Sequence, residues 1–535
     1  MILLIITSIF WLIAFTKKLL FWIYLWQLKE YHVGRFADHF RTDKGKRLVF
    51  NYLLLVKVLG LLGIILFARL GLASSKLVFV YLIIAVLLVE SLFFLKRVKQ
   101  KTFKSPVLTR KISLILTTGL SFELLILSFV FGVGIKEVRG IAGLMLLDIL
   151  APLIVSGLVL GFQPLAVVLR DRILNQAKIK RAQFKDLLVI GVTGSYGKTS
   201  VKEFLATILS SKYKVLKTER HVNSEVGIAT SILDDLDENY DVFVCEMGAY
   251  GPGGIKLLAD IAGPKIGIIT GINEQHLSTF GSLARTIKTK FELIDSLPED
   301  GVAILNYSNQ HIRQENVSGH NPKLKNVRYF ALDEEADVWA RDIKADKETI
   351  SFKLFSKDGE TADICLNLIG QHNVSNVLAA VTCAKNLGMS FEEIAEAAKK
   401  IEPWQSGMEL KKGVNGLSVV DATYSANPSG VISHLDYLKN WPGKKIIVMP
   451  CLIELGKASE EVHKSIGQKI NEVCDLAIIT TKDRFREIKK VAPKAVFIEN
   501  PGEIINKIKS FSQEGNVVLL ESRISNQIIN QLVCK

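Results

Sequence analysis

Long apolar stretches separated by short charged loops fill the first third of the chain. Each has about the 20 residues that a helix needs to cross a bilayer, and they run over 2–26, 48–71, 76–95, 112–134 and 141–162. From residue 187 onward the pattern changes, because short apolar runs alternate with helical patterns, as in an α/β sheet. The pattern therefore predicts a multi-pass α-helical membrane segment followed by α/β domains.

The second part of the chain has the pattern of two α/β domains. With helices between them, strands are expected at 187–192, 241–246, 266–270 and 302–305. A further unit begins near Pro403. We therefore expect three domains: a transmembrane domain of about five helices at 1–165, a central domain at 166–401 and a C-terminal domain at 402–535.

Charge separates the same two parts and indicates their orientation. Residues 1–175 hold 22 Lys and Arg but only 8 Asp and Glu, which accounts for the whole net charge of +14. This charge therefore gives no reason to expect a nucleic-acid partner. The two most basic loops, 27–47 and 96–111, are predicted to be cytoplasmic by the positive-inside rule. We expect a multi-pass protein of the cytoplasmic membrane whose later domains lie in the cytoplasm.

Four charged residues lie within the apolar stretches: Lys57, Glu90, Glu123 and Asp148. Charges are costly inside a bilayer and usually face the interior of a helix bundle. One interpretation is pairing between helices, for example of Lys57 with Glu90. The other is a polar groove for a membrane lipid headgroup, or for a membrane partner contacted by Glu90, Glu123 and Asp148. The sequence leaves both open.

A glycine-rich segment, Gly-Val-Thr-Gly-Ser-Tyr-Gly-Lys-Thr-Ser at 191–200, follows the first expected strand and leads into a helix. This arrangement is typical of phosphate binding, because backbone N–H groups and the helix dipole converge on the phosphate oxygens. We expect Lys198 to reach the β- and γ-phosphates and Thr199 to hold Mg²⁺. The residues predicted to bind ATP are Thr193, Gly194, Ser195, Tyr196, Gly197, Lys198, Thr199 and Ser200.

Later segments place further candidates at the ends of strands and in helices. Glu246 ends the expected strand at 241–246, where a carboxylate is well placed to hold Mg²⁺ beside a phosphate loop. His276 lies in Asn-Glu-Gln-His at 273–276, and Lys290 lies in the helical pattern that follows. Taken alone, a lone histidine is more often structural, and a helix lysine is more often a surface residue.

In this order the motifs resemble the Mur ligase family of ATP-dependent amide-bond-forming enzymes, over residues 187–535. They are most similar to the branch that adds a D-alanyl-D-alanine dipeptide. The resemblance implies a P-loop central domain and a Rossmann-like C-terminal domain. It also implies chemistry in which ATP phosphorylates a carboxylate and an amine then attacks the acyl phosphate.

The family resemblance further implies roles for individual residues. Two Mg²⁺ ions are expected at Thr199, Glu246, His276 and Lys290, with Lys290 carrying a carbamate. The residues expected to act in catalysis are Lys198, Lys290, His276 and Glu246. Asn373 and Asp421 are expected to contact the nucleotide. Contacts to the acceptor or the amine are expected from Asn223, Ser224, Tyr424, Asn427, Ser522 and Arg523.

The chain departs from the family pattern at several positions. Tyr-Gly-Pro-Gly replaces an Asn-His segment at 250–253, the expected arginine is missing around 406–408, and Ala422 and Leu520 replace an acid and a lysine. The phosphate and metal residues are retained. Two alternatives stay open: a poly-γ-glutamate-type synthetase, which also joins membrane spans to Mur-like domains, and a nucleotide-binding membrane scaffold with impaired activity, which these departures would fit.

The apolar stretches occupy the place of the family's N-terminal domain, which grips the UDP of a soluble precursor. We therefore expect the acceptor to be held at the membrane, as a lipid-linked precursor in peptidoglycan or related envelope synthesis. The amine would be an amino acid or a dipeptide. The alternative is that the spans only tether a ligase that still uses a soluble precursor.

Overall fold

The computed structural model spans residues 1–535 and describes all of them except 220–221, 316, 425 and 535. It divides into two compact units, Met1–Arg170 and Asp171–Lys535. The boundary falls within the helix α8 (Gln163–Gln183), the basic segment between the last apolar stretch and the first strand.

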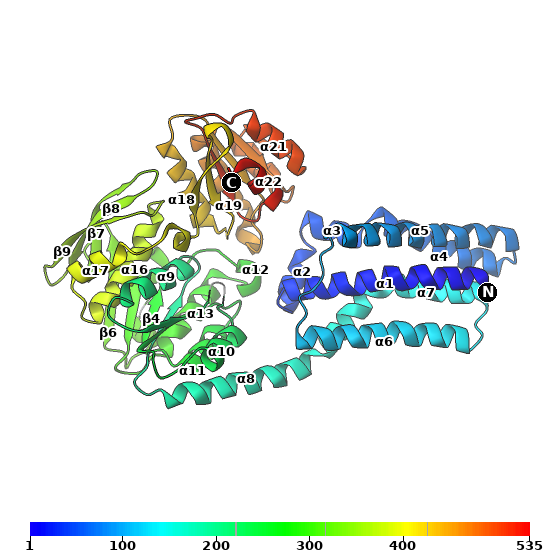
Figure 1. Cartoon of the computed structure of the whole chain (residues 1–535), viewed down its shortest axis with the longest axis horizontal. Helices are drawn as coiled ribbons and strands as arrows, with labels where there is room; N and C mark the ends of the chain where they lie inside the picture. Colours follow the sequence, from blue (N-terminus) through cyan, green and yellow to red (C-terminus); the bar gives the residue numbers. More distant parts are fainter. Residues whose placement is uncertain (220–221, 316, 425, 535) are drawn as a thin grey trace. The chain divides into compact units, whose positions relative to one another are not determined.

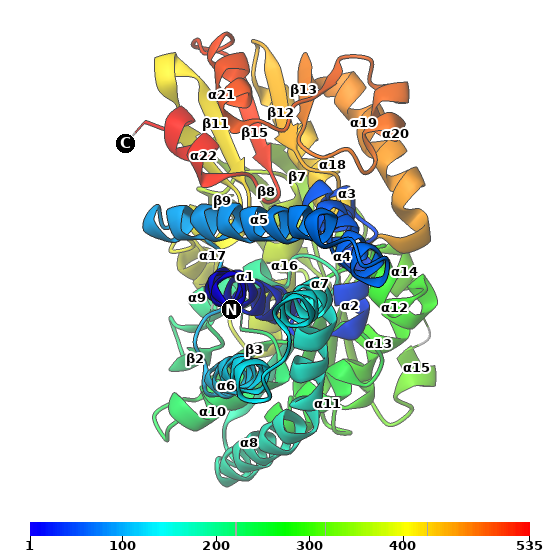
Figure 2. The same ribbon diagram turned by 90° about the vertical axis from the view of Figure 1, so that its right-hand side faces the viewer.

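The first unit is a bundle of long helices (Figure 1). Among the described residues, five helices are long and apolar enough to cross a membrane, in agreement with the prediction. In Figure 2, α1, α6 and α7 are seen nearly end-on, and α5 runs sideways above them in the view. The long helices are α1 (Ile2–Leu28), α4 (Tyr52–Arg69), α5 (Ala73–Lys99), α6 (Arg110–Gly132) and α7 (Glu137–Gly161), and the first basic loop adds the short α2 (Val33–His39) and α3 (Asp43–Val49).

The helix ends in this unit follow from local sequence. The Asn51 side chain accepts a hydrogen bond from the Leu54 N–H at 2.8 Å and so begins α4, and Thr109 caps α6 in the same way. Leucines such as Leu125 and Leu153 leave about two thirds of their surface exposed on the outer faces. Exposed leucines of this kind are typical of helices that face lipid.

The charged residues within the spans meet in the bundle interior. Lys57 is buried and its Nζ forms ion pairs with Glu90 and, at 2.7 Å, with Asp148. The predicted pairing of Lys57 with Glu90 is therefore confirmed. Lys17 pairs with Glu90 at 2.9 Å and Lys18 with Asp148 at 2.6 Å, so these two lysines leave α1 continuous. Glu123 instead accepts a hydrogen bond from Thr16 at 2.8 Å.

The second unit begins with a nine-stranded sheet of order β2-β3-β1-β4-β5-β6-β7-β8-β9, parallel from β2 to β7 and antiparallel beyond. The four strands predicted from sequence correspond to β1, β3, β4 and β5. The strands are β1 (Leu188–Thr193), β2 (Val215–Lys217), β3 (Val242–Glu246), β4 (Ile266–Ile269), β5 (Val302–Asn306), β6 (Asn326–Leu332), β7 (Val338–Ala345), β8 (Ile350–Ser356) and β9 (Thr361–Leu366).

Helices cover both faces of this sheet because its strands are apolar on both sides. Ile190 of β1 packs in a core with α9 and α16, whereas its neighbour Val189 packs on the opposite face with α10 and α11. The helices around the sheet are α9 (Lys198–Leu209), α10 (Glu225–Asp234), α11 (Gly254–Ala262), α12 (Leu277–Phe280), α13 (Leu283–Asp295), α14 (Gln310–Arg313), α15 (Val317–His320), α16 (His372–Asn386) and α17 (Phe391–Ala398).

A second sheet of six strands, β10-β11-β15-β12-β13-β14, is parallel except for the edge strand β10. Alternate residues of its strands face opposite cores, one with α18, α19 and α20 and the other with α21 and α22. The expected class of fold is confirmed. The elements are β10 (Glu409–Lys412), β11 (Ser418–Ala422), β12 (Lys445–Met449), β13 (Leu476–Ile479), β14 (Ala495–Phe497), β15 (Val517–Glu521), α18 (Pro428–Tyr437), α19 (Ser459–Val473), α20 (Phe485–Val491), α21 (Pro501–Lys509) and α22 (Asn526–Leu532).

Candidate active site

The glycine-rich segment forms a tight loop between β1 and α9. Gly197 has a φ of 76°, and a Cβ at this position would lie 2.4 Å from Oδ1 of Asn376. A Cβ at Gly194 would lie 2.1 Å from Oγ1 of Thr270, so neither position has room for a side chain. The loop ends at the N-terminus of α9, where first-turn N–H groups have no partner within the helix. This geometry fits an anion such as a nucleotide phosphate.

A carboxylate and a hydroxyl meet beside this loop. Thr199 Oγ1 donates to Oε2 of Glu246 at 2.8 Å, and Asn223 Nδ2 donates to Oε1 of the same carboxylate at 2.9 Å. Parallel pairing of β1 with β3 puts Glu246 opposite Val192 and so brings the two segments together. The described residues contain no group of three or more His, Cys, Asp or Glu able to hold a metal. Thr199 and Glu246 nevertheless fit Mg²⁺, which keeps waters and substrate phosphates as its other ligands.

Two lysines share the electrostatic environment of Glu246. Lys198 Nζ donates to the carbonyl of Gly194 at 2.9 Å. Burial lowers the pKa of Lys198, and the charge of Glu246 partly opposes this change. Lys290 lies buried on α13, where burial and the positive charge of Lys198 lower its pKa to about 7. The amine of Lys290 therefore loses its proton near neutral pH.

His276 connects the first sheet's domain to the second. It precedes α12 with a φ of 61°, and its Nδ1 lies 2.6 Å from Oε2 of Glu454. The backbone N–H of Ser278 donates to the Glu454 carbonyl at 3.0 Å. Burial lowers the pKa of His276, and its bond to Glu454 opposes that shift.

A second contact joins the same two domains on another side. Asn273 Nδ2 donates to Oδ1 of Asn427 at 3.1 Å and to Oγ of Ser429 at 3.0 Å. Asn427 also caps α18, because its Oδ1 accepts from the Gly430 N–H at 3.0 Å. Side chains from both domains therefore meet within hydrogen-bond distance.

These contacts surround a cavity of about 540 Å³, a size typical of small-molecule sites. Residues from both sheets' domains line it. Of the residues predicted from sequence, the structure brings together here Ser195, Tyr196, Gly197, Lys198, Thr199, Ser200, Asn223, Glu246, His276, Tyr424, Asn427 and Arg523.

Three other predicted residues, Thr193, Gly194 and Ser224, are not among the residues that line the cavity. Thr193 is buried and its hydroxyl donates to the Met247 carbonyl at 2.9 Å. The Gly194 carbonyl accepts from Lys198, and Ser224 caps α10 through the Gly227 N–H. Direct ligand contacts by these residues stay predictions.

Three more predicted residues are engaged with their neighbours. Asn373 is fully buried, and its Nδ2 donates to the Ile369 carbonyl at 2.9 Å. Asp421 accepts from Lys411 at 2.6 Å and from the Thr423 hydroxyl at 2.6 Å, and these bonds lower its pKa although burial opposes them. The Ser522 N–H donates to the Ala422 carbonyl at 3.1 Å. Nucleotide contact by Asn373 and Asp421 and substrate contact by Ser522 likewise stay predictions.

The structure also adds residues that sequence reasoning missed. Asn306, at the carboxyl end of β5, lines the cavity, and its buried Oδ1 has no hydrogen-bond partner among the described residues. A buried acceptor of this kind fits a ligand with N–H donors, such as a purine amine. Asn376 and His372 also line the cavity, and burial beside His434 lowers the pKa of His372 to about 3. His372 and Asn376 lie on either side of Asn373, the residue for which the family resemblance implied a nucleotide contact.

Comparison with known proteins gives consistent results for both domains. Residues 192–384 match the Mur ligase middle domain, and residues 408–523 match the Mur ligase, glutamate ligase domain. The UDP-N-acetylmuramoyl-tripeptide–D-alanyl-D-alanine ligase of Bacillus subtilis is 30% identical over 316 residues, which are 57% of this chain and 66% of that relative. The chain thus spans just under two thirds of that relative's length.

Solved structures show the same similarity. MurF from Acinetobacter baumannii is 26% identical with a TM-score of 0.63, over 68% of this chain and 80% of that chain. MurF from Thermotoga maritima in complex with ADP is 28% identical with a TM-score of 0.59, over 68% of this chain and 83% of that chain. With its phosphate loop, its Thr199–Glu246 pair and both domain matches, the chain belongs to the Mur ligase family of ATP-dependent amide-bond-forming enzymes.

Proposed function

We propose that the protein is a membrane-anchored, MurF-like ligase that joins a carboxylate to an amine at the expense of ATP, in peptidoglycan or related envelope synthesis. The observation that carries this proposal is the convergence of Lys198, Glu246 and the C-terminal side chains Tyr424 and Arg523 on one cavity. Membrane anchoring is supported by the five long apolar helices.

The reaction would proceed in two balanced steps. An oxygen of the acceptor carboxylate attacks the γ-phosphorus of ATP, the bond to the bridging oxygen breaks, and ADP leaves. The amine nitrogen then attacks the acyl carbon, inorganic phosphate leaves, and the nitrogen loses one proton to solvent. Negative charge collects on the transferring phosphoryl group, so preorganised cations and N–H groups lower the barrier.

The residues around the cavity have distinct roles in this chemistry. Lys198 and the N–H groups of α9 would hold the phosphates, and Asn306 would accept from the nucleotide base. Mg²⁺ bound at Thr199 and Glu246 would neutralise phosphate charge. His276 would orient the acceptor carboxylate, with Glu454 holding its imidazole in place.

We further propose that Lys290 works as a carbamate. It is buried, its charge interacts with that of Glu246, and as a plain ammonium it would repel the metal ions expected there. A carbamate carries a negative charge, and its oxygen atoms can serve as ligands to a metal ion. His276 and this carbamate would together hold a second Mg²⁺.

The proposed substrates rest on the similarity of this chain to its relatives. The Bacillus subtilis relative is named for a UDP-N-acetylmuramoyl-tripeptide acceptor and a D-alanyl-D-alanine amine. We propose a dipeptide or amino acid amine for this chain, and an acceptor held at the membrane.

The test is product identification with full-length, detergent-solubilised protein. ATP, candidate acceptors and candidate amines are incubated together, and the products are identified by mass spectrometry while ADP is measured. We expect ADP formation that depends on both acceptor and amine. Binding of ATP without such dependence would instead indicate the nucleotide-binding scaffold.

A further inference from the structure

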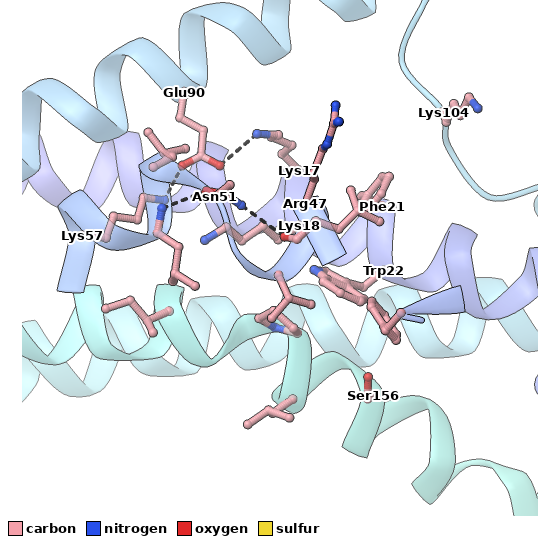
Figure 3. A pocket seen from close by; sticks show the side chains of 18 of the residues that line it. Lys17, Lys18, Phe21, Trp22, Arg47, Asn51, Lys57, Glu90, Lys104 and Ser156 are labelled. Carbon is pink, nitrogen blue, oxygen red and sulfur yellow. Dashed lines mark hydrogen bonds and ion pairs between the residues drawn. The ribbon is translucent and has the colours of Figure 1, made fainter. Parts of the chain in front are cut away.

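The helical unit contains a cavity of about 940 Å³ (Figure 3). This cavity is separate from the candidate active site, which lies in the second unit. It opens between the second halves of α1, α5 and α7 and the start of α4. These segments adjoin the two basic loops, 27–47 and 96–111, and the end of α7 from which the chain continues into α8. The cavity therefore lies at the level where lipid headgroups meet the cytoplasm, if the bundle spans a membrane as expected.

The cavity carries an excess of positive charge. Its lining includes six cations, Lys17, Lys18, Arg47, Lys57, Arg97 and Lys104, but only one carboxylate, Glu90. Asp148 binds Lys18 and Lys57 from behind, and Asp43 pairs with Arg47 at 2.7 Å. Six cations thus face three carboxylates. The cations of the lining outnumber its carboxylate, which suits a phosphate or diphosphate group.

A proline places one of these cations. Pro152 lies inside α7 and has no N–H to donate to the carbonyl of Asp148, four residues before it. Lys18 Nζ donates to that carbonyl instead, at 2.8 Å, as well as to the Asp148 carboxylate at 2.6 Å. Pro152 itself lines the cavity. The break in the helix ladder therefore holds an ammonium group at the cavity wall.

The remaining walls are apolar and aromatic. Trp22 stacks on Phe40 with ring centroids 5.9 Å apart, and Leu54, Phe103 and Leu153 also line the cavity. Leu153 is 70% exposed on the outer face of α7. A free inorganic anion would leave these walls without an apolar partner, whereas a hydrocarbon chain would cover them.

We propose that this cavity binds the phosphate or diphosphate headgroup of a membrane amphiphile, with the hydrocarbon chain along the apolar wall. Two sources share this chemistry: a prenyl diphosphate carrier and an ordinary anionic phospholipid. The inference rests on the proposed function for one point only. If the protein is a ligase, a lipid carrier bound in this cavity would be the carrier to which the acceptor is attached.

The test measures binding of farnesyl diphosphate to full-length protein in phosphatidylcholine nanodiscs by microscale thermophoresis. ADP and Mg²⁺ are present throughout so that the nucleotide site is occupied. The variant Arg97→Gln/Lys104→Gln removes two exposed cations that line the cavity, and the matched control Lys96→Gln/Lys99→Gln removes two exposed cations of the same segment that do not.

We expect farnesyl diphosphate to bind the parent, and the cavity variant to bind it about tenfold or more weakly, because a direct charge-assisted hydrogen bond to a phosphate oxygen contributes roughly tenfold or more to affinity. The control should change binding less than twofold. Displacement by nanodisc phosphatidylglycerol would identify a bulk phospholipid as the occupant. Equal weakening in both variants, or competition by inorganic pyrophosphate as strong as by the prenyl compound, would overturn the proposal.

The proposed ligase function is measured separately on the same preparations, as amine-dependent ADP formation. If the parent protein showed no amine-dependent ADP formation but bound the lipid normally, the proposed ligase function would be refuted and the lipid site would not. Normal ligation without variant-sensitive binding would refute the lipid site alone.

Discussion

Replacing Lys198 by alanine tests the phosphate loop most directly. The Lys198 ammonium donates to the Gly194 carbonyl at 2.9 Å and to the Ser195 carbonyl at 3.5 Å, so two carbonyls of the loop itself hold it in place. Losing one preorganised cation from a phosphoryl-transfer site costs about 3–4 kcal/mol of transition-state stabilisation, or roughly 10²- to 10³-fold in rate. We therefore expect kcat for ADP formation to fall by that factor.

Folding should change little in the same variant. The lost hydrogen bonds contribute on the order of 1 kcal/mol, partly offset because the ammonium no longer has to be desolvated. A shift in Tm of a few degrees at most is expected. Lys212→Ala, which removes an exposed lysine just beyond the end of α9, is the matched control and should keep both activity and Tm. If Lys198→Ala kept kcat within about threefold of the parent while folding normally, the catalytic role of this loop would be refuted.

Four further predictions follow from the same geometry. Glu246→Gln should keep the hydrogen bond from Thr199 but weaken Mg²⁺ dependence, seen as a rise of about tenfold or more in the Mg²⁺ concentration for half-maximal rate; an unchanged requirement would contradict the metal role. Lys290→Ala should lose activity that short carboxylates partly restore, and full activity in Lys290→Arg would rule out a carbamate. Gly197→Ala should reduce nucleotide affinity by about tenfold or more, because its Cβ would lie 2.4 Å from Asn376 Oδ1; unchanged affinity in a titration with a fluorescent ADP analogue would argue against the loop geometry. A fragment beginning at Asp171 retains the part of α8 that packs on the first sheet, and it should ligate a soluble UDP-linked acceptor far less efficiently than the full chain; equal efficiency would favour a simple membrane tether.

Local patterns were sufficient to predict the five long helices, four strands of the first sheet and the phosphate loop. A bilayer imposes a fixed helix length, and a glycine turn between a strand and a helix has few uses other than holding an anion. The roles of His276 and Lys290 came instead from the family resemblance, because neither residue has a local signal that separates a ligand from a structural side chain. No local pattern pointed to Asn306 as a cavity residue, since an asparagine at a strand end is common in sequences of any function.

By itself, then, the sequence determined the five long apolar helices, four strands of the first sheet and the position of the phosphate loop, because these depend on periodicity and on residues close together in the chain. Tertiary structure alone decided which distant side chains meet. The contact of His276 with Glu454 joins residues 178 positions apart, and the sharing of Lys57 between Glu90 and Asp148 depends on how three helices rotate about their axes. The freed carbonyl of Asp148 found its partner in Lys18, 130 residues away. Such contacts are set by the packing of whole elements against one another, and no local preference encodes that packing.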